Sequence, residues 1–256
     1  MIRLKEVGKI YQTDTASTWA VGNVSLDIAN GEFVSLVGPS GCGKSTLLNM
    51  IAGFMAPSSG SIEVDGQLVK GQILPELGYI FQKDTLLPWF TVHKNVALGL
   101  KFRSFPEEEI QRRVAALLEM GHLSAFADAY PHQLSGGMRR RVALLMSLAV
   151  EPRILLMDEP FGALDTHTKT HLHRELIEIW RNLGQTVVLV THDLDEAITL
   201  STRVVVLSGP PSTVLLDERI DIPHPRDVFS LRESAEFLRH YRSIWSVLGQ
   251  QFRAAA

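Results

Sequence analysis

The sequence predicts an α/β fold, in which a sheet core carries a helical insert and is followed by a short C-terminal segment. The first third of the chain consists mainly of short apolar or alternating runs, which are typical of strands. The middle, from about residue 91 to residue 150, places apolar residues at helical spacing. The last third alternates dense apolar runs of the parallel-sheet type with helical stretches. The length of 256 residues suits one large domain, or one domain with a small subdomain.

Strands and one helix are expected in the first third. The strands are expected at residues 2–7, 24–28, 33–37, 61–64 and 79–81. The helix is expected over residues 44–53, because Leu47, Leu48 and Ile51 fall on one side of it. Glycines beginning at Gly38 separate the strand at 33–37 from this helix.

Helices fill the middle and alternate with strands in the last third. Pro106 followed by three glutamates suits a helix N-terminus, where the dipole favours negative charge. Ser135 is a suitable N-cap for a helix that runs to about residue 150. Strands are then expected at 154–157, 187–190 and 204–207, with helices at about 166–183 and 194–200.

Composition and charge narrow the class of protein. The 25 Lys and Arg against 28 Asp and Glu give a formal charge of -3, which does not support a nucleic-acid binder. Cys42 is the only cysteine, so no intrachain disulfide can form. The N-terminus does not resemble a secretory signal, and no stretch approaches the roughly 20 apolar residues that cross a bilayer. We therefore expect a cytoplasmic chain, and any membrane part must come from another polypeptide.

A phosphate-binding loop is expected between the strand at 33–37 and the following helix. Its residues fit G-x-x-x-x-G-K-[ST] at every fixed position: Gly38, Pro39, Ser40, Gly41, Cys42, Gly43, Lys44, Ser45 and Thr46. The glycines let the backbone wrap around phosphate oxygens, and the helix N-terminus faces the same anion. Lys44 can reach the β- and γ-phosphates, and Ser45 can ligate Mg²⁺. Cys42 is interpreted as a spacer in this loop rather than as a redox group.

Two carboxylates end the apolar run at 154–157. Asp158 is the expected metal-side carboxylate. Glu159 is expected to polarise the attacking water, since phosphoryl transfer needs mainly positioning and charge neutralisation. Taken alone, Asp-Glu-Pro could be an ordinary loop start. His192 ends the next apolar run, where a neutral imidazole could bond the γ-phosphate or orient the water. A purely structural histidine is the alternative.

A second anion site is expected at the start of the helix that Ser135 caps. Ser135 offers a hydroxyl, Gly136 and Gly137 expose backbone amides, and the helix dipole points outward. One nucleotide rarely needs two helix N-termini from distant parts of one chain. Each chain is therefore expected to hold a nucleotide in its own loop and to offer this second site to a partner's nucleotide. The working unit would then be a dimer held together by ATP.

These motifs, in this order, resemble the nucleotide-binding subunit of an ATP-binding cassette (ABC) transporter over residues 1 to about 227. The resemblance implies that Tyr11 stacks on adenine, that residues 38–46 form the phosphate loop, and that Gln82 senses Mg²⁺ and the membrane partner. It implies the signature at 134–138, with Asp158 as the metal-side acid and Glu159 as the catalytic base. It also implies that Ala163, Leu164 and Asp165 form the loop that crosses the dimer interface, and that His192 is the switch histidine. Lys44, Glu159 and His192 are then the expected catalytic residues, and Ser45, Gln82 and Asp158 the expected Mg²⁺ ligands. Met138 and Met146 depart from the commonest family pattern without touching a phosphate contact.

The family resemblance also implies an architecture and a set of partners. It implies a P-loop NTPase core with a mixed or parallel sheet, an N-terminal antiparallel β subdomain, and a helical signature subdomain at about residues 88–150. The ATPase domain is expected over residues 1–227, with a short helical tail over 228–256. ATP and Mg²⁺ are the implied cofactors. The implied partners are a second copy of the chain, integral membrane permease subunits and an extracytoplasmic solute-binding protein, without nucleic acid. The chain is expected at the cytoplasmic face of the inner or plasma membrane, as a peripheral subunit.

Four segments resemble the nitrate, taurine and alkanesulfonate importer branch of this family, at residues 51–54, 86–89, 95–100 and 222–227. Trp89 and Phe90 are expected either near the partner surface or in the core, and these two interpretations are equally open. A soluble ABC ATPase acting on another macromolecular machine is an alternative, disfavoured because the chain has one cassette and no long coiled-coil arms. A metabolic P-loop kinase is a second alternative, against which the signature at 134–138 argues.

Three other features carry weaker expectations. The arginines at 139–141 are expected on a solvated helix face, with one of them tightening the signature helix. His167, His171 and His173 are expected on an exposed helix face rather than in a metal site. An apolar stripe on the C-terminal helix is expected to pack on its own domain or on a dimer mate, and consists of Phe237, Leu238, Tyr241, Ile244, Trp245 and Leu248.

Overall fold

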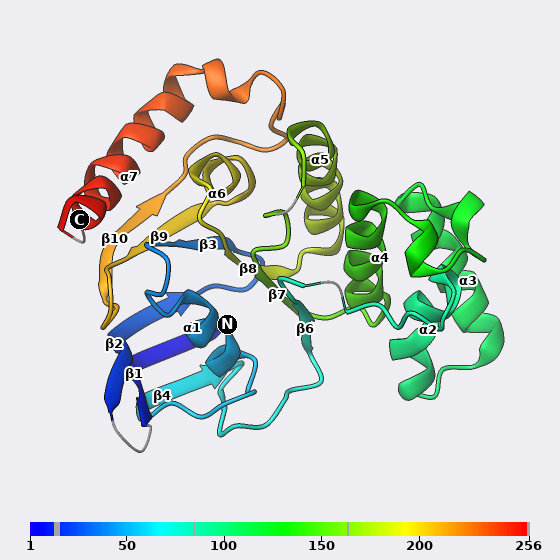
Figure 1. The fold of residues 1–256 in the computed structure, drawn as a ribbon, viewed down its shortest axis with the longest axis horizontal. Coiled ribbons are helices and arrows are strands. Elements are labelled where there is room, and N and C mark those ends of the chain that lie inside the picture. Colours follow the sequence, from blue (N-terminus) through cyan, green and yellow to red (C-terminus); the bar gives the residue numbers. More distant parts are fainter. Residues whose placement is uncertain (13–15, 84, 163, 255–256) are drawn as a thin grey trace.

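The computed structural model describes residues 1–12, 16–83, 85–162 and 164–254, and confirms the α/β fold (Figure 1). A six-stranded sheet has the order β10-β9-β3-β8-β7-β6. Its strands are β3 (Phe33–Val37), β6 (Leu77–Ile80), β7 (Ile154–Asp158), β8 (Thr186–Val190), β9 (Arg203–Leu207) and β10 (Val214–Arg219). Neighbouring strands pair in parallel, except that β10 runs antiparallel to β9. The sheet is therefore mixed, with a parallel centre.

The alternation of side chains along the strands explains how both faces of this sheet are buried. Val34 and Leu36 of β3 point to the face that α1 (Lys44–Ile51) covers. Phe33 points to the opposite face, into a core shared with α5 (Thr166–Leu183). The helix α6 (Leu194–Leu200) packs against β3 and β9. Every residue of β3 and β8 is buried, as a parallel sheet covered on both sides requires.

A second sheet is formed by strands that come before and after α1 in the chain. It is antiparallel, has the order β2-β1-β4-β5, and consists of β1 (Ile2–Gln12), β2 (Ser17–Ile28), β4 (Ser59–Val64) and β5 (Gln67–Leu68). Its inward residues join the same apolar cluster as α1 and the inner face of the larger sheet. This confirms an N-terminal antiparallel sheet, although β1 and β2 are longer than the strands expected from the sequence.

A helical unit lies between β6 and β7, at one end of the molecule (Figure 1). Its helices are α2 (Val92–Phe102), α3 (Glu107–Met120) and α4 (Gly136–Ala149), with 3-10 turns at Ser124–Phe126 and Pro131–Gln133 between α3 and α4. These helices enclose an apolar cluster of their own, which includes Val96, Val114 and Val142. The predicted N-cap is confirmed, because the Ser135 hydroxyl accepts a hydrogen bond from the Met138 amide.

The C-terminal helix α7 (Ala235–Ala254), after a 3-10 turn at Leu231–Glu233, crosses α6 and β10 at the end of the molecule away from α2 and α3 (Figure 1). Phe237, Ile244 and Leu248 are buried against α6 and the sheet. Leu238 and Trp245 are 40% and 48% exposed, so the expected apolar stripe is only partly covered by the chain itself. None of the helices in the described ranges combines the length and the apolarity needed to cross a membrane.

Candidate functional site

The phosphate loop leaves the carboxyl end of β3 and enters α1 directly. Gly41 and Gly43 have φ values of 75° and 92°, a left-handed conformation that side chains rarely adopt. A Cβ atom on Gly43 would also lie 2.7 Å from the Ala20 carbonyl oxygen. The turn therefore needs glycine at this position both for its conformation and for its close approach to β2.

Lys44 lies under this loop and is 6% exposed. Its Nζ donates to the carbonyl oxygens of Gly38 and Pro39, at 2.8 and 2.9 Å. The ammonium group is thus held where the loop backbone curves around it. The Cys42 side chain is fully buried in the apolar cluster below the loop, so this residue can offer an anion only its backbone. Ser40 is exposed on the outer side of the turn.

Ser45 and Asp158 meet at the end of β7. The Ser45 hydroxyl donates to Asp158 Oδ1 at 2.9 Å, although 113 residues separate the two. Burial raises the pKa of the Asp158 carboxyl, and the Ser45 bond opposes that rise. A hydroxyl and a carboxylate are oxygen donors of the kind that Mg²⁺ prefers, with phosphate oxygens and water completing its shell. This donor set therefore fits Mg²⁺. Within the described ranges, no group of three or more His, Cys, Asp and Glu forms a metal cage.

Glu159 follows Asp158 and brings two further predicted residues together. The Gln82 amide donates to Glu159 Oε2 at 3.1 Å, and His192 Nδ1 lies 3.2 Å from the same oxygen. Gln82 follows β6, Glu159 follows β7 and His192 follows β8, so three neighbouring strand ends supply the group. The Glu159 backbone has φ 43°, which is uncommon for a residue with a side chain. The Glu159 amide donates to the Val190 carbonyl at 2.9 Å, which holds this conformation.

Tyr11 lies at the other side of the loop. Its hydroxyl is 3.3 Å from Thr46 Oγ1 and 3.4 Å from Met55 Sδ, and the residue is 41% exposed. The ring therefore stands beside the end of the phosphate loop with part of its surface accessible. This position is compatible with a stacking contact to a base.

The signature residues lie on α4, in the helical unit, and no hydrogen bond in the described ranges joins Ser135, Gly136 or Gly137 to the phosphate loop. The start of α4 packs instead against the start of α5. A Cβ atom on Gly137 would lie 2.7 Å from Thr168 Cγ2. The structure thus places the signature apart from the phosphate loop of the same chain.

Asp165 lies beside the signature, because it caps α5. The Asp165 carboxylate accepts from the Thr168 amide at 3.0 Å, and this bond lowers the pKa of Asp165. Of the loop expected at 163–165, Ala163 lies outside the described residues.

Some contacts at this site were not predicted. Arg140 donates to the carbonyl oxygens of Phe81, at 3.0 Å, and of Gln82, so it ties α4 to the loop after β6. Arg139 donates to the Leu134 carbonyl at 2.9 Å, and Arg141 is 3.8 Å from Glu175. The expectation of a solvated arginine face is therefore wrong, although one tightening contact was expected. The run of three arginines near the start of a helix is the sequence signal for such contacts, but it does not identify the groups that accept their hydrogen bonds.

The three histidines of α5 also differ from expectation. His167 is exposed, and its Nε2 lies 3.3 Å from that of His171. His173 is 2% exposed and packs edge-on against Phe161, with ring centroids 4.8 Å apart. Burial lowers the pKa of His173 to about 4, which keeps it neutral at physiological pH. The expected exposed face is therefore wrong for His173.

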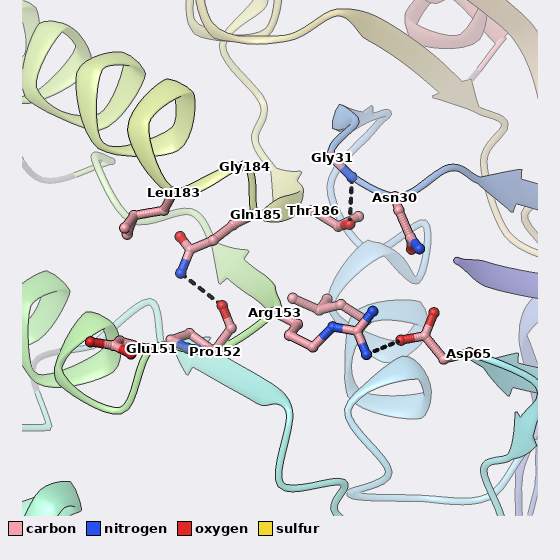
Figure 2. A pocket seen from close by; sticks show the side chains of 11 residues that line it. Asn30, Gly31, Asp65, Glu151, Pro152, Arg153, Leu183, Gly184, Gln185 and Thr186 are labelled. Carbon is pink, nitrogen blue, oxygen red and sulfur yellow. Dashed lines mark hydrogen bonds and ion pairs between the residues drawn. The ribbon is translucent and has the colours of Figure 1, made fainter.

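A separate cavity of about 320 Å³ lies at the other end of the strands of the larger sheet, away from the phosphate loop (Figure 2). Its walls include Gly31, Ile154 and Thr186, at the amino ends of β3, β7 and β8. Asp65 and Arg153 form an ion pair of 3.2 Å across its mouth. Because the phosphate loop is at the carboxyl ends of these strands, this cavity is not part of the nucleotide site.

Comparison with known proteins places these motifs in context. Residues 21–162 match the model of the ABC transporter family. The nitrate import ATP-binding protein NrtD of Synechocystis sp. is 40% identical over 252 residues, which cover 96% of this chain and 94% of that protein. The taurine import ATP-binding protein TauB of Rhizobium johnstonii is 44% identical over 245 residues, which cover 93% and 92%. A dimeric, post-hydrolysis structure of the ATP-binding cassette MJ0796 with ADP and Pi is 35% identical, has a TM-score of 0.77, and covers 87% of this chain and 100% of that one.

Proposed function

This chain belongs to the ABC transporter family, and we propose that it is the ATP-hydrolysing subunit of an importer for a small solute of the nitrate, taurine or sulfonate kind. The observation that carries the proposal is the convergence of Gln82, Glu159 and His192 beside Ser45 and Asp158, at the carboxyl ends of adjacent strands. Relatives of similar length, named as import ATP-binding proteins, support the importer role.

In this proposal, ATP phosphates bind in the loop at 38–46, where Lys44 exchanges its bonds to loop carbonyls for phosphate oxygens. Ser45, Asp158 and Gln82 would hold Mg²⁺, which supplies charge neutralisation on the β- and γ-phosphates. Glu159 accepts a proton from the attacking water, and His192 orients that water or the γ-phosphate. The two groups would act on one reaction centre, since His192 Nδ1 lies 3.2 Å from Glu159 Oε2.

A homodimer follows from the same geometry. The signature residues Ser135, Gly136 and Gly137 lie beside Asp165 and away from the phosphate loop of their own chain. We propose that they contact the nucleotide held by a second subunit, so that two chains enclose two ATP molecules. The dimeric structure of MJ0796, 35% identical to this chain, supports this assembly.

The proposed membrane partner is a pair of permease subunits that receive solute from an extracytoplasmic binding protein. Their docking surface would be the aromatic region around the loop after β6. Trp89 is 66% exposed, and Phe81 stacks on Phe54 with ring centroids 5.9 Å apart, both rings being about 40% exposed. Exposed aromatic side chains of this kind are enriched at protein interfaces. The chain would then act at the cytoplasmic face of the membrane, as a peripheral subunit. The ATPase domain would span residues 1–227, with its helical subdomain at about 88–150 and a tail at 228–256.

Glu159→Gln tests the catalytic assignment. The amide keeps the size of the carboxylate and can still accept from Gln82, so the fold should persist while the base is lost. We expect the rate of ATP hydrolysis to fall by at least about 100-fold, and light scattering to detect a dimer in Mg·ATP. Glu178→Gln, on the exposed face of α5, is the matched control and should hydrolyse ATP normally. Hydrolysis by Glu159→Gln at a rate near that of the wild type would contradict the assignment.

The importer role needs a second measurement. The tagged chain should co-purify with a polytopic membrane protein, and ATP-dependent uptake of nitrate, taurine or an alkanesulfonate should fail in a strain lacking the chain. Co-purification with nucleic acid, or with a soluble complex alone, would favour an ABC ATPase that acts on another machine.

A further inference from the structure

A partly buried ion-pair network lies behind His192, and the proposed reaction does not use it. Lys169 Nζ, on the first turn of α5, donates to Glu196 Oε1 at 2.9 Å and lies 3.5 Å from Asp193 Oδ2. Glu196, on α6, is 2% exposed. A glutamate is almost never buried to this extent unless it is paired. The pairing therefore accounts for a carboxylate among the apolar residues that make up most of α6.

Glu196 holds the backbone on both sides of His192. Its second oxygen accepts from the Thr191 hydroxyl at 2.6 Å, and that hydroxyl accepts from the Asp193 amide at 3.0 Å. The Asp193 carboxylate in turn caps α6, accepting from the Asp195 amide at 2.9 Å. His192 thus projects from a short segment whose two flanking residues are fixed, while its own side chain is 59% exposed.

The other end of the network belongs to the loop that Asp165 ends. The Lys169 amide donates to the Asp165 carbonyl at 3.0 Å, in the first turn of α5, and the Asp165 side chain caps that turn. A shift of Asp165 therefore moves the backbone that carries Lys169. Because Lys169 is bonded to Glu196, the shift reaches the segment around His192 through two hydrogen bonds.

We propose that Lys169 is a positioning residue, which joins the Asp165 loop to His192 through Glu196 and Thr191. Contact of Asp165 with a second subunit would then align His192 with Glu159 in the same chain. This inference rests on the proposed function, since it requires that His192 take part in ATP hydrolysis. An ion pair that only stabilises the fold would have no selective effect on the step that His192 serves.

The test is a double-mutant cycle in the full-length chain. ATP hydrolysis and thermal unfolding are measured for Lys169→Met, for His192→Ala and for the combination. We expect Lys169→Met to lower kcat by about tenfold, because small misplacements of a reacting group are costly, with KM for ATP within about twofold. Added to His192→Ala, the same substitution should lower the residual rate by less than about twofold, since its target is already absent.

Three further variants keep the proposal falsifiable. Lys169→Arg should restore most of the rate, because a guanidinium can reach the same carboxylate. Thr191→Val removes the bond to Glu196 without leaving a charge unpaired, and should show the same non-additivity with His192→Ala even if Lys169→Met does not fold. Arg174→Met, which disrupts an exposed pair on the same helix, is the matched control and should change nothing.

Two results would overturn the proposal. In the first, Lys169→Met and Thr191→Val each lower the rate of ATP hydrolysis by the same factor in the wild type and in His192→Ala. In the second, these substitutions raise KM for ATP and leave kcat unchanged. Failure of the proposed function is a different result: the wild-type chain would not hydrolyse ATP, or His192→Ala would do so at the wild-type rate.

Discussion

Arg226 offers a quantitative test of how the C-terminal segment is attached. Its guanidinium is 6% exposed and donates to the carbonyl oxygens of Ile198, Thr199 and Ser201, at 2.7, 2.9 and 2.9 Å. It also donates twice to the Ile222 carbonyl, at 2.7 and 3.1 Å. Three of these acceptors lie at or just after the last turn of α6, where a helix leaves carbonyls without internal partners and favours a cation. Burial lowers the pKa of Arg226 to about 10, so it remains charged at neutral pH.

Arg226→Met removes this donor and leaves four buried carbonyls to be satisfied. Each unpaired buried acceptor costs roughly 1–3 kcal/mol, but water entry and the removal of a buried charge offset part of the sum. We expect a net loss of about 3 kcal/mol in the free energy of unfolding. For a chain of this size that corresponds to a fall in Tm of about 6–12 °C. Because the acceptors of Arg226 on α6 lie at the end of that helix away from His192, kcat measured well below the new Tm should be unchanged.

Scanning calorimetry of Arg226→Met, Arg226→Lys and an exposed control, Arg242→Met, measures this directly. Arg226→Lys should recover only part of the stability, because an ammonium has three donors and lacks the planar fork that reaches several carbonyls at once. Arg242→Met should leave Tm within about 2 °C. A change in Tm below about 2 °C for Arg226→Met, or complete recovery with lysine, would refute this account of how the segment around Arg226 is attached to α6.

Three other predictions concern the nucleotide site. Burial raises the pKa of Asp158, and this carboxyl must be ionised to hold Mg²⁺. As the pH is lowered, the affinity for Mg·ATP in nucleotide titrations should therefore begin to fall at a higher pH than it would with an ordinary aspartate. Asp158→Asn should abolish this pH dependence. Tyr11→Ala should weaken ATP binding by about tenfold in fluorescence titrations, whereas Tyr11→Phe should not, because a stacking contact needs only the ring. Arg140→Gln removes the charged donor to the Phe81 and Gln82 carbonyls, and should lower kcat by about fivefold with the affinity for ATP unchanged. Equal losses in kcat and in affinity would contradict a role for Arg140 in joining α4 to the loop after β6.

The parts of the fold that follow from the sequence are those set by local signals. The bounds of β3, α5 and α6 match those expected, because Asp165 and Asp193 provide N-caps and Gly184, with φ 62°, provides a left-handed C-cap. β10 is not predictable in the same way. Its residues alternate between half-buried and exposed, and charged residues follow its three apolar ones, so the strand depends on pairing with β9 rather than on its own pattern.

The members of the nucleotide site are predictable, but their bonds to the rest of the molecule are not. Motif spacing identifies Ser45 and Asp158 as partners because the carboxyl ends of parallel strands meet at one edge. Nothing in the spacing connects Lys169 to Glu196, which lies 27 residues away, since that bond depends on how α5 and α6 cross. A glutamate on a mostly apolar helix is the sequence signal, and it indicates a need for a partner without identifying the partner.

The helix α4, which begins at the signature, belongs to two cores at once. Leu144 and Leu148 pack in the cluster beneath the larger sheet, whereas Val142 and Leu145 pack in the cluster of the helical unit. Apolar contacts are non-directional, so packing alone does not fix how far α4 slides along the sheet. Two directional bonds fix the position of α4 along the sheet. Near the start of α4, Arg140 donates to the loop after β6, and near its end the Ser147 hydroxyl donates to the Tyr79 carbonyl at 3.2 Å. Arg140 therefore joins the loop after β6 to the start of α4, next to the signature, while the apolar contacts of α4 are divided between two cores.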